Sequence, residues 1–298
     1  MDTTIAAADV DTCNASTLVS MIRSLPPLPD VAQEIIARFQ DEFISGNDIA
    51  DIVSGDPTIS ARLFSLANSA YYGLQEPVSD MRVVVGRVLG PDAVRSLAFA
   101  LATNRTFDLS ACLGFDSDRF WNRALNTAAA AQRFSKVVED LDPTEREFAY
   151  IAGLCHSLGL MALACSLPEK TSDVLNAHTE DDELKMEELC VGKLGYSIET
   201  VTHELVNHWK LPQEIVVAYQ HRAEQRSADN KLASILEASI KASRQIEHML
   251  SATEPTDLHI PYIAKDLPDV ELNTLKKATV GTEAQRQATE TTVKAMVG

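Results

Sequence analysis

The chain has 298 residues, of which 45% are hydrophobic and 23% are charged, a balance that excludes a disordered or fibrous protein. This length predicts one or two domains with enough interior to fold without disulfides or a structural metal. The 26 basic and 43 acidic residues give a formal net charge of -17, which repels phosphate backbones, so we expect no nucleic-acid partner.

The cysteines and the N-terminus indicate the cellular compartment in which the protein is expected. The five cysteines are scattered and form no CxxC pair, which argues against a disulfide framework or a zinc ribbon and fits a reducing cytoplasm. The N-terminus has no basic segment ahead of an apolar run, and no stretch of about 18 uncharged apolar residues occurs. We therefore expect a cytoplasmic protein that is neither secreted nor associated with a membrane.

Apolar residues recur at helical spacing along nearly the whole chain, and this periodicity predicts an all-α fold. Residues 1–15 lack a durable apolar period, so we expect a flexible leader there. The Val83–Val85 triplet is the best strand candidate, but it is short and isolated, so we assign it to a helix. Candidate helix N-caps and first-turn prolines are Asp30, Asn47, Asp56, Ser79 and Asp142, with Pro57 and Pro143.

The later part of the chain differs in charge and regularity. Residues 139–188 hold 13 acids and only 3 basic residues, which fits either a solvated helical face or a docking surface for a basic partner. A further helix extends to about Leu250. Residues 251–298 are expected to form a helical extension interrupted by turns, with a last polar helix at about 282–296.

Motifs for common cofactor and metal sites are absent or wrongly spaced, and we expect no cofactor. No GxxxxGK[ST], GxGxxG or GxSxG string occurs. His203 and His208 nearly form a zinc-binding HExxH motif, but a spacing of five residues turns them about 140° apart on a helix. Cys155 and His156 are neighbours that point about 100° apart, so we interpret Cys155 as a buried thiol. His156 is either a hydrogen-bonded core residue or part of a site.

A set of short strings resembles one known family, the HDOD domain, an HD-related output domain of bacterial signalling proteins. The resemblance covers about residues 25–223, and its most specific string is Ala67–Gly73. Trp209 and Pro212 lie in the last string, and we expect structural roles for both. The strings are Leu25–Pro29, Asp56–Leu63, Ala67–Gly73, Pro77–Ser79, Phe120–Trp121, Ala152–Gly159, Leu194–Tyr196 and Trp209–Pro212.

The residues of the early strings also have a plain physical interpretation. Asp56 is expected to cap a helix that Pro57 opens, while Asn68, Ser69 and Gly73 allow the chain to turn sharply. The Asn68 side chain is expected to bond backbone groups where two helices meet, with contact to a ligand as the alternative.

The resemblance also implies an architecture. It implies a multi-helical HD-like bundle in which residues 16–250 form the HDOD domain. Within it, an N-terminal helical lobe covers residues 16–107 and a degenerate HD-like lobe covers residues 115–250, and residues 251–298 form the C-terminal helical extension.

The resemblance allows each metal-ligand position of HD phosphohydrolases to be compared with the matching residue of this sequence. These enzymes hold metal with an early His, a His-Asp doublet and a later Asp. The resemblance places the early His at or beside Arg123, the doublet at His156 and Ser157, and a further His near Ile198, while His221 lies near the closing His segment. An arginine, a serine and an isoleucine cannot supply the lost ligands. We therefore expect a vestigial site with no catalytic residue and no bound metal.

Three functional classes remain open at this point. The favoured one is a non-catalytic bacterial signal-transduction module that contacts a signalling protein partner. The alternative is a sensor of an anionic small molecule or nucleotide, with Arg123, His156 and Ser157 as polar contacts in the old cleft. The second alternative is a residual metal-dependent phosphohydrolase with an unusual ligand set.

Overall fold

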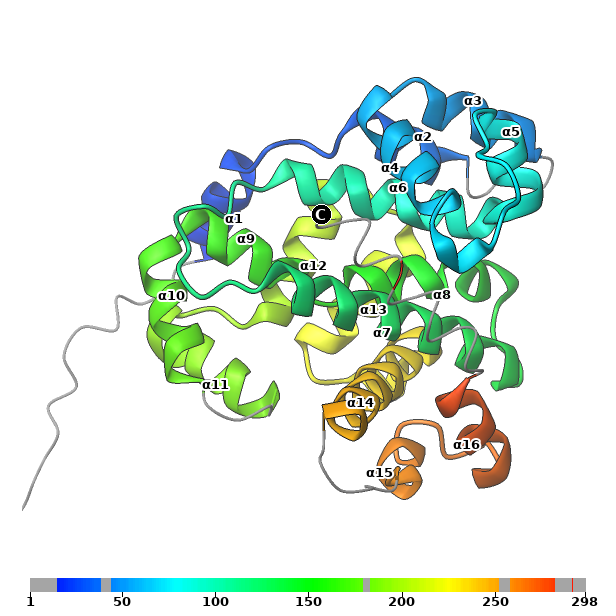
Figure 1. Cartoon of the computed structure of the whole chain (residues 1–298). Helices are drawn as coiled ribbons and strands as arrows, with labels where there is room; N and C mark the ends of the chain where they lie inside the picture. Colours follow the sequence, from blue (N-terminus) through cyan, green and yellow to red (C-terminus); the bar gives the residue numbers. More distant parts are fainter. Residues whose placement is uncertain (1–14, 39–43, 179–182, 252–257, 282–290, 292–298) are drawn as a thin grey trace, which may run out of the picture.

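The computed structural model describes residues 15–38, 44–178, 183–251, 258–281 and 291, and Figure 1 shows how its helices are arranged. Every regular element in these ranges is a helix, so the prediction of an all-α fold is confirmed. Residues 1–14 of the expected flexible leader lie outside the described residues, and Ala15 begins the first helix.

The N-terminal part of the chain forms α-helices joined by two short elements of other helix types. Val83–Val85 is helical as predicted, because it joins the end of α5 to the π-helical η2. The elements are α1 (Ala15–Ser24), α2 (Asp30–Ala37), α3 (Gly46–Ser54), α4 (Pro57–Ala67), the 3₁₀ turn η1 (Ala70–Tyr72), α5 (Met81–Val83), η2 (Val84–Val88) and α6 (Pro91–Thr106).

The expected boundary between the two lobes, at residues 107–115, falls in the connection between α6 and α7. The second part of the chain begins with α7 (Ser117–Val137), α8 (Pro143–Cys155), α9 (Leu158–Ser166), α10 (Pro168–Ala177) and α11 (Glu183–Leu194). It continues with α12 (Ile198–His208), α13 (Gln213–Ala223), η3 (Ser227–Asp229) and α14 (Lys231–Ser251).

Two of the predicted N-caps lie where the sequence placed them. The Asp56 carboxylate accepts hydrogen bonds from the backbone N–H groups of Thr58 and Ile59, at 2.9 and 3.0 Å. The Asp142 carboxylate accepts one from the N–H of Thr144 at 2.9 Å. Each satisfies donors that the first turn of a helix leaves without an intrahelical partner.

The other predicted N-caps are wrong by one or two positions. At α3, Ser45 is the cap because its hydroxyl accepts from the Asp48 N–H while the Asp48 carboxylate accepts from the Ser45 N–H, a reciprocal pair that Asn47 cannot form. At α5, Asp80 accepts from the N–H two residues on. The observed caps are Pro29 instead of Asp30, Ser45 instead of Asn47 and Asp80 instead of Ser79.

The helices of the N-terminal part lie in two places. Helices α2, α3 and α4 pack against α6 at the upper right of Figure 1, whereas α1 lies at the left and contacts α12. Helix α7 packs most extensively against α8 and α14. The helix α6 therefore connects the cluster α2–α5 to the rest of the molecule.

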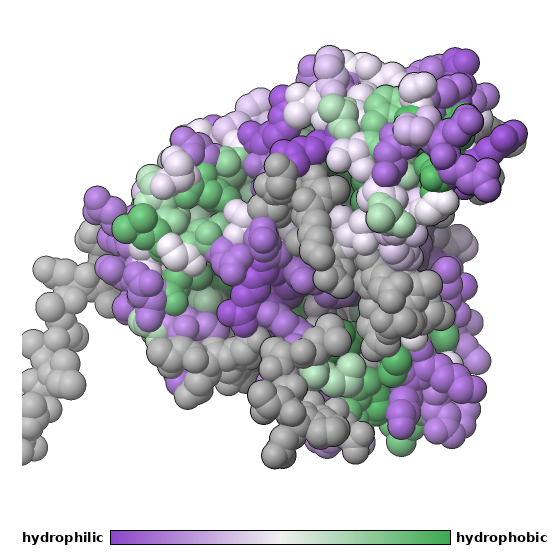
Figure 2. Space-filling view, viewed as in Figure 1, coloured by the Kyte–Doolittle hydropathy of each residue, from purple (hydrophilic) through white to green (hydrophobic). Residues whose placement is uncertain are grey.

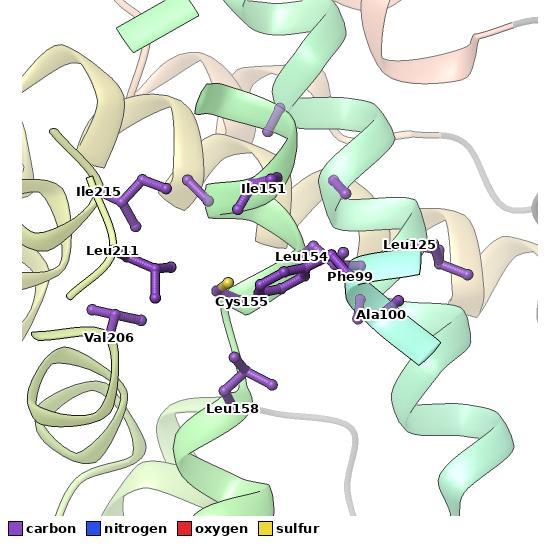
Figure 3. Close-up of a cluster of buried hydrophobic side chains, with 14 of the residues drawn as sticks. Phe99, Ala100, Leu125, Ile151, Leu154, Cys155, Leu158, Val206, Leu211 and Ile215 are labelled. Atoms are coloured by element: carbon purple, nitrogen blue, oxygen red, sulfur yellow. The ribbon is translucent and has the colours of Figure 1, made fainter. Parts of the chain in front are cut away.

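A continuous hydrophobic core joins these helices, and Figure 3 shows a cluster of its side chains. Phe99 and Ala100 of α6, Leu125 of α7, Leu154 of α8 and Ile215 of α13 are among the side chains drawn there, and all are almost fully buried. Because α6 shares its buried face with the second part of the chain, burial of apolar surface holds the two parts together.

Within residues 251–298, the structure describes α15 (Ile260–Ala264) and α16 (Leu272–Val280), and the last polar helix expected there lies almost wholly outside the described residues. Both helices lie near α14 at the lower right of Figure 1. The Arg133 side chain of α7 donates to the carbonyl oxygens of Ala278 and Thr279, at 2.5 and 3.3 Å, near the end of α16. This contact fixes the extension to α7, because a cation pairs favourably with the carbonyls that end a helix.

Among the described residues, the stretch Pro143–Ser166 is long and apolar enough to cross a membrane. It comprises α8 and α9, and 78% of its apolar window is buried inside the protein. Its hydrophobicity is therefore accounted for by core packing.

Candidate functional site

The junction between α8 and α9 places His156 and Ser157 in the interior. Two glycines allow the close packing there: a Cβ atom on Gly153 would lie 2.7 Å from the Ala128 Cα of α7, and one on Gly159 would lie 2.2 Å from the Ile198 carbonyl oxygen of α12. Neither distance is compatible with a side chain. The family string around His156 therefore contains glycines because α7 and α12 pack directly against its backbone.

His156 is only 4% exposed, and both of its ring nitrogens are engaged. Its Nδ1 lies 3.0 Å from the Gly153 carbonyl oxygen, which can only accept, so Nδ1 carries the proton. Its Nε2 lies 2.6 Å from the Ser157 hydroxyl oxygen. Burial and, to a smaller extent, the charges of Arg222, Arg123 and Arg244 together lower the pKa of His156 to about 3, so the ring is neutral at physiological pH.

A cavity of about 170 Å³ opens beside this junction, with room for on the order of ten water molecules. It is enclosed by α7, α9, α10, α11, α12 and α14, and Figure 2 shows apolar side chains gathered over α9 and α10 on the face drawn, beside strongly hydrophilic ones. The lining residues are Gly114, Phe115, Asp116, Arg119, Phe120, Arg123, His156, Ser157, Leu160, Leu175, His178, Met186, Ile198 and Arg244.

Four of the five vestigial positions therefore meet in one cavity: Arg123, His156, Ser157 and Ile198. The fifth, His221, is not among the described residues that line it. His221 lies on α13 next to Arg222, and its partly buried ring contributes nothing to the cavity wall.

Arginines dominate the charge of the cavity. Arg119, Arg123 and Arg244 line it, against one acidic lining residue, Asp116. The Glu247 carboxylate accepts from the Arg123 Nε and Nη2 atoms, at 2.9 and 2.7 Å, and from the Arg119 Nε atom at 2.9 Å. Arg119 and Arg123 are thus held in place by a carboxylate from α14, and an anion already occupies part of their donor set.

The sequence did not point to Arg119, Arg244 or Glu247. Arg119 and Arg123 are four residues apart, which places them on one face of α7, and Arg244 and Glu247 are three apart on α14. These spacings are visible in the sequence, but they also describe ordinary solvated helix faces. Only the packing of α7 against α14 shows that the two faces meet.

A divalent metal does not fit this donor set. The protonated Nδ1 of His156 cannot ligate, its Nε2 accepts from Ser157, and the neighbouring charges are guanidinium cations. In the described part of the chain, no group of three or more His, Cys, Asp or Glu side chains is arranged to hold a metal. Burial also raises the pKa of the Cys155 thiol, so it stays protonated and is no ligand.

The loop of the most specific family string is closed by Asn68. Its side-chain amide donates to the Val78 carbonyl oxygen at 2.9 Å, and its carbonyl accepts from the Val78 N–H at 2.7 Å. Ser69 precedes the turn η1, and Gly73 ends it with a φ of 58°, in the left-handed region. The loop binds its own backbone, and none of these residues lines the cavity.

Asp56 has a second partner besides the helix it caps. The Arg105 Nη1 atom of α6 donates to both of its carboxylate oxygens, at 3.1 and 2.9 Å. Burial raises the pKa of Asp56, but hydrogen bonds from Ile59 and Thr58 and the charge of Arg105 outweigh it, so the pKa lies below its ordinary value. Asp56 and Pro57, which begins α4, thus serve to fix α4 against α6.

Trp209 and Pro212 connect distant parts of the chain. The Trp209 ring lies 5.9 Å from that of Phe107, and its indole nitrogen donates to the Pro26 carbonyl oxygen at 3.4 Å. Pro212 occupies the N-cap position of α13. Both residues lie outside the cavity, and their contacts stabilise the fold.

Comparison with known proteins gives consistent results. An uncharacterized protein of Treponema pallidum (strain Nichols) is 23% identical over 205 residues, which are 68% of this chain and 38% of that protein. Among solved structures, a protein of Marinobacter aquaeolei VT8 named for signal transduction has a TM-score of 0.73 at 22% identity, covering 95% of this chain and 65% of that one. The chain thus spans less than two thirds of both proteins.

Two further structures match nearly end to end. A Shewanella amazonensis SB2B protein named as a phosphohydrolase has a TM-score of 0.69 at 22% identity, covering 93% of this chain and 98% of that one. An HDOD domain protein of Geobacter sulfurreducens has a TM-score of 0.63 at 20% identity, covering 92% of this chain and 93% of that one. The HDOD domain family model matches residues 25–225. This match spans most of the chain, which therefore belongs to the HDOD domain family.

Proposed function

We propose that this protein is a non-catalytic regulatory module of bacterial signal transduction, which acts in the cytoplasm through contact with another signalling protein. Its family and the signal-transduction name of its Marinobacter neighbour support a signalling role. The arginines in its cavity support the absence of HD phosphohydrolase chemistry.

The replacement of a metal ligand by Arg123 carries the proposal. A unit positive charge about 5 Å from a divalent ion repels it by roughly 7 kcal/mol at an effective dielectric constant of about 20. Arg119 and Arg244 add to this repulsion. Glu247, which pairs with Arg123 and Arg119, offsets part of it, but Ser157 supplies no carboxylate beside His156 itself. A metal-activated water therefore has no favourable place beside His156.

A turnover assay tests the loss of catalysis. Phosphomonoesters, phosphodiesters and nucleotides are incubated with the protein and with Mg²⁺, Mn²⁺, Ni²⁺ or Fe²⁺, and we expect no metal-dependent hydrolysis. The matched pair of variants is His156→Ala and His208→Ala, since His208 is exposed and lies outside the cavity. Hydrolysis that the His156 variant abolishes and the His208 variant retains would overturn the proposal and favour a residual phosphohydrolase.

The acidic face of α10 and α11 supports a basic partner. Glu169, Asp173 and Glu188 are exposed on these two helices, which pack against each other. Lys170 and Lys193 are also exposed on these helices, so the face has a modest excess of acidic charge. Such an excess steers a basic protein and adds specificity. Reversing all three charges to lysine should abolish cross-linking to the partner in cells while circular dichroism stays unchanged, and undiminished cross-linking would refute this surface.

A second candidate function is favoured by the arginines themselves. Three guanidinium groups around one cavity can bind a small anion through charge-assisted hydrogen bonds, which makes the old HD cleft a sensor site. Calorimetric titration of inorganic phosphate into wild type and Arg123→Ala tests it. We expect saturable binding that weakens by about 10- to 100-fold in the variant, the scale of a lost charged hydrogen bond. Absence of binding at millimolar phosphate would eliminate this function.

A further inference from the structure

The protons of the His156–Ser157 pair are fixed by the Gly153 carbonyl. This oxygen only accepts, so the proton of the neutral imidazole is on Nδ1 and the Nε2 atom has a lone pair. The 2.6 Å contact between Nε2 and the Ser157 hydroxyl is then a hydrogen bond that the hydroxyl donates. The only proton of the Ser157 hydroxyl is therefore directed at His156.

Ser157 consequently faces the cavity as an acceptor. A hydroxyl oxygen has one proton and two lone pairs, and the proton is already used. A ligand atom beside this oxygen must donate a hydrogen bond, because an ionised oxygen there would place lone pair against lone pair. The same cavity holds Arg119, Arg123 and Arg244, which favour a negative charge.

We propose that the cavity selects small oxyanions that carry their own O–H donor, such as hydrogen phosphate, over fully ionised oxyanions such as sulfate. This inference rests on the anion-sensor function proposed above and specifies its ligand. The arginines bind the charged oxygens, and the ligand O–H donates to Ser157. The volume of about 170 Å³ accommodates an ion of this size with room for further groups.

Hydrogen phosphate and sulfate provide a matched comparison. At about pH 8 both are tetrahedral dianions of similar size, and they differ by the single proton on phosphate. A site with a buried acceptor rejects a ligand that lacks the matching donor, because its polar group is left unpaired. We expect phosphate to bind at least about tenfold more tightly than sulfate, which corresponds to about 1.4 kcal/mol.

Calorimetric titration of both anions at pH 8 into wild type and two variants tests the selection. Ser157→Ala removes the acceptor, and the phosphate-to-sulfate affinity ratio should fall to below about threefold. His156→Phe releases the Ser157 proton, which can then point to the ligand, so sulfate should bind more tightly than in wild type. Ser54→Ala is the control, because the Ser54 hydroxyl donates to the Ala50 carbonyl of its own helix and Ser54 is not among the residues that line the cavity, and it should keep the wild-type ratio.

The possible outcomes distinguish failure of the proposed selectivity from failure of the anion-sensor function on which it rests. Equal binding of the two anions by wild type would overturn the selection while leaving the anion site in place, as would an unchanged ratio in both variants. Binding of neither anion would overturn the anion site and the selection together. Circular dichroism identifies a variant that fails to fold, and the other variant then decides the result.

Discussion

Acidification should destabilise the protein through His156. In the folded state its pKa is lowered to about 3, whereas an unfolded chain has the ordinary value of 6.5. Between these values the unfolded state binds one more proton than the folded state. The stability that the neutral ring contributes is therefore fully present above pH 6.5 and is lost progressively as the pH falls towards 3.

The size of this effect follows from the two pKa values. Each pKa unit corresponds to about 1.4 kcal/mol, so the full shift is worth on the order of 4 to 5 kcal/mol. Because pH 5 lies about one and a half pH units below the unfolded-state pKa, about 2 kcal/mol of this stabilisation is lost at that pH. A loss of this size is a substantial part of the free energy of unfolding of an ordinary domain.

Urea denaturation at pH 7.5, 6.5, 5.5 and 5.0 measures the effect, with His156→Gln as the comparison. Glutamine retains a donor and an acceptor but does not titrate in this range. The variant is expected to be less stable than wild type at pH 7.5. Between pH 7.5 and 5.0, however, its free energy of unfolding should fall by about 2 kcal/mol less than that of wild type. Equal pH dependence in the two proteins, or an NMR titration of His156 near its ordinary pKa, would refute the reasoning.

Three further predictions concern contacts in the core and the cavity. Asp56→Ala should lower the free energy of unfolding by about 1 to 2 kcal/mol, measured in urea, because α4 loses its cap; a change within about 0.3 kcal/mol would contradict this. Gly159→Ala should lower the free energy of unfolding by about 3 kcal/mol through overpacking. The control Gly192→Ala, whose added Cβ meets open space, should be neutral or stabilising. Similar effects of the two substitutions would contradict the close packing at Gly159. Glu247→Gln should tighten phosphate binding about 3- to 10-fold by calorimetry, since a competing carboxylate leaves Arg123; weaker binding would argue against that competition.

The fold was predictable because helical periodicity persists along the chain. The exact helix starts were less so, since Asn47 and Ser45 are both good caps and only the reciprocal bonds with Asp48 select Ser45. The position of α1 beside α12 depends on packing between segments far apart in sequence. No local pattern contains that information.

The candidate site was predictable only in part. The resemblance identified Arg123, His156, Ser157 and Ile198, which line one cavity, whereas His221, which it placed near the closing His segment, is not among the described residues that line it. The ion pair between Arg123 and Glu247 joins residues 124 apart in the chain. Its two partners resemble ordinary surface charges until the fold brings α7 and α14 together.

Metal content tests the loss of the HD metal site most directly. The purified protein is incubated with excess Mn²⁺, dialysed, and measured by elemental analysis together with His156→Ala. Because Arg119, Arg123 and Arg244 line the cavity that His156 faces, we predict well under one metal ion per chain in both proteins. About one equivalent in wild type that is lost in the His156 variant would contradict the central claim.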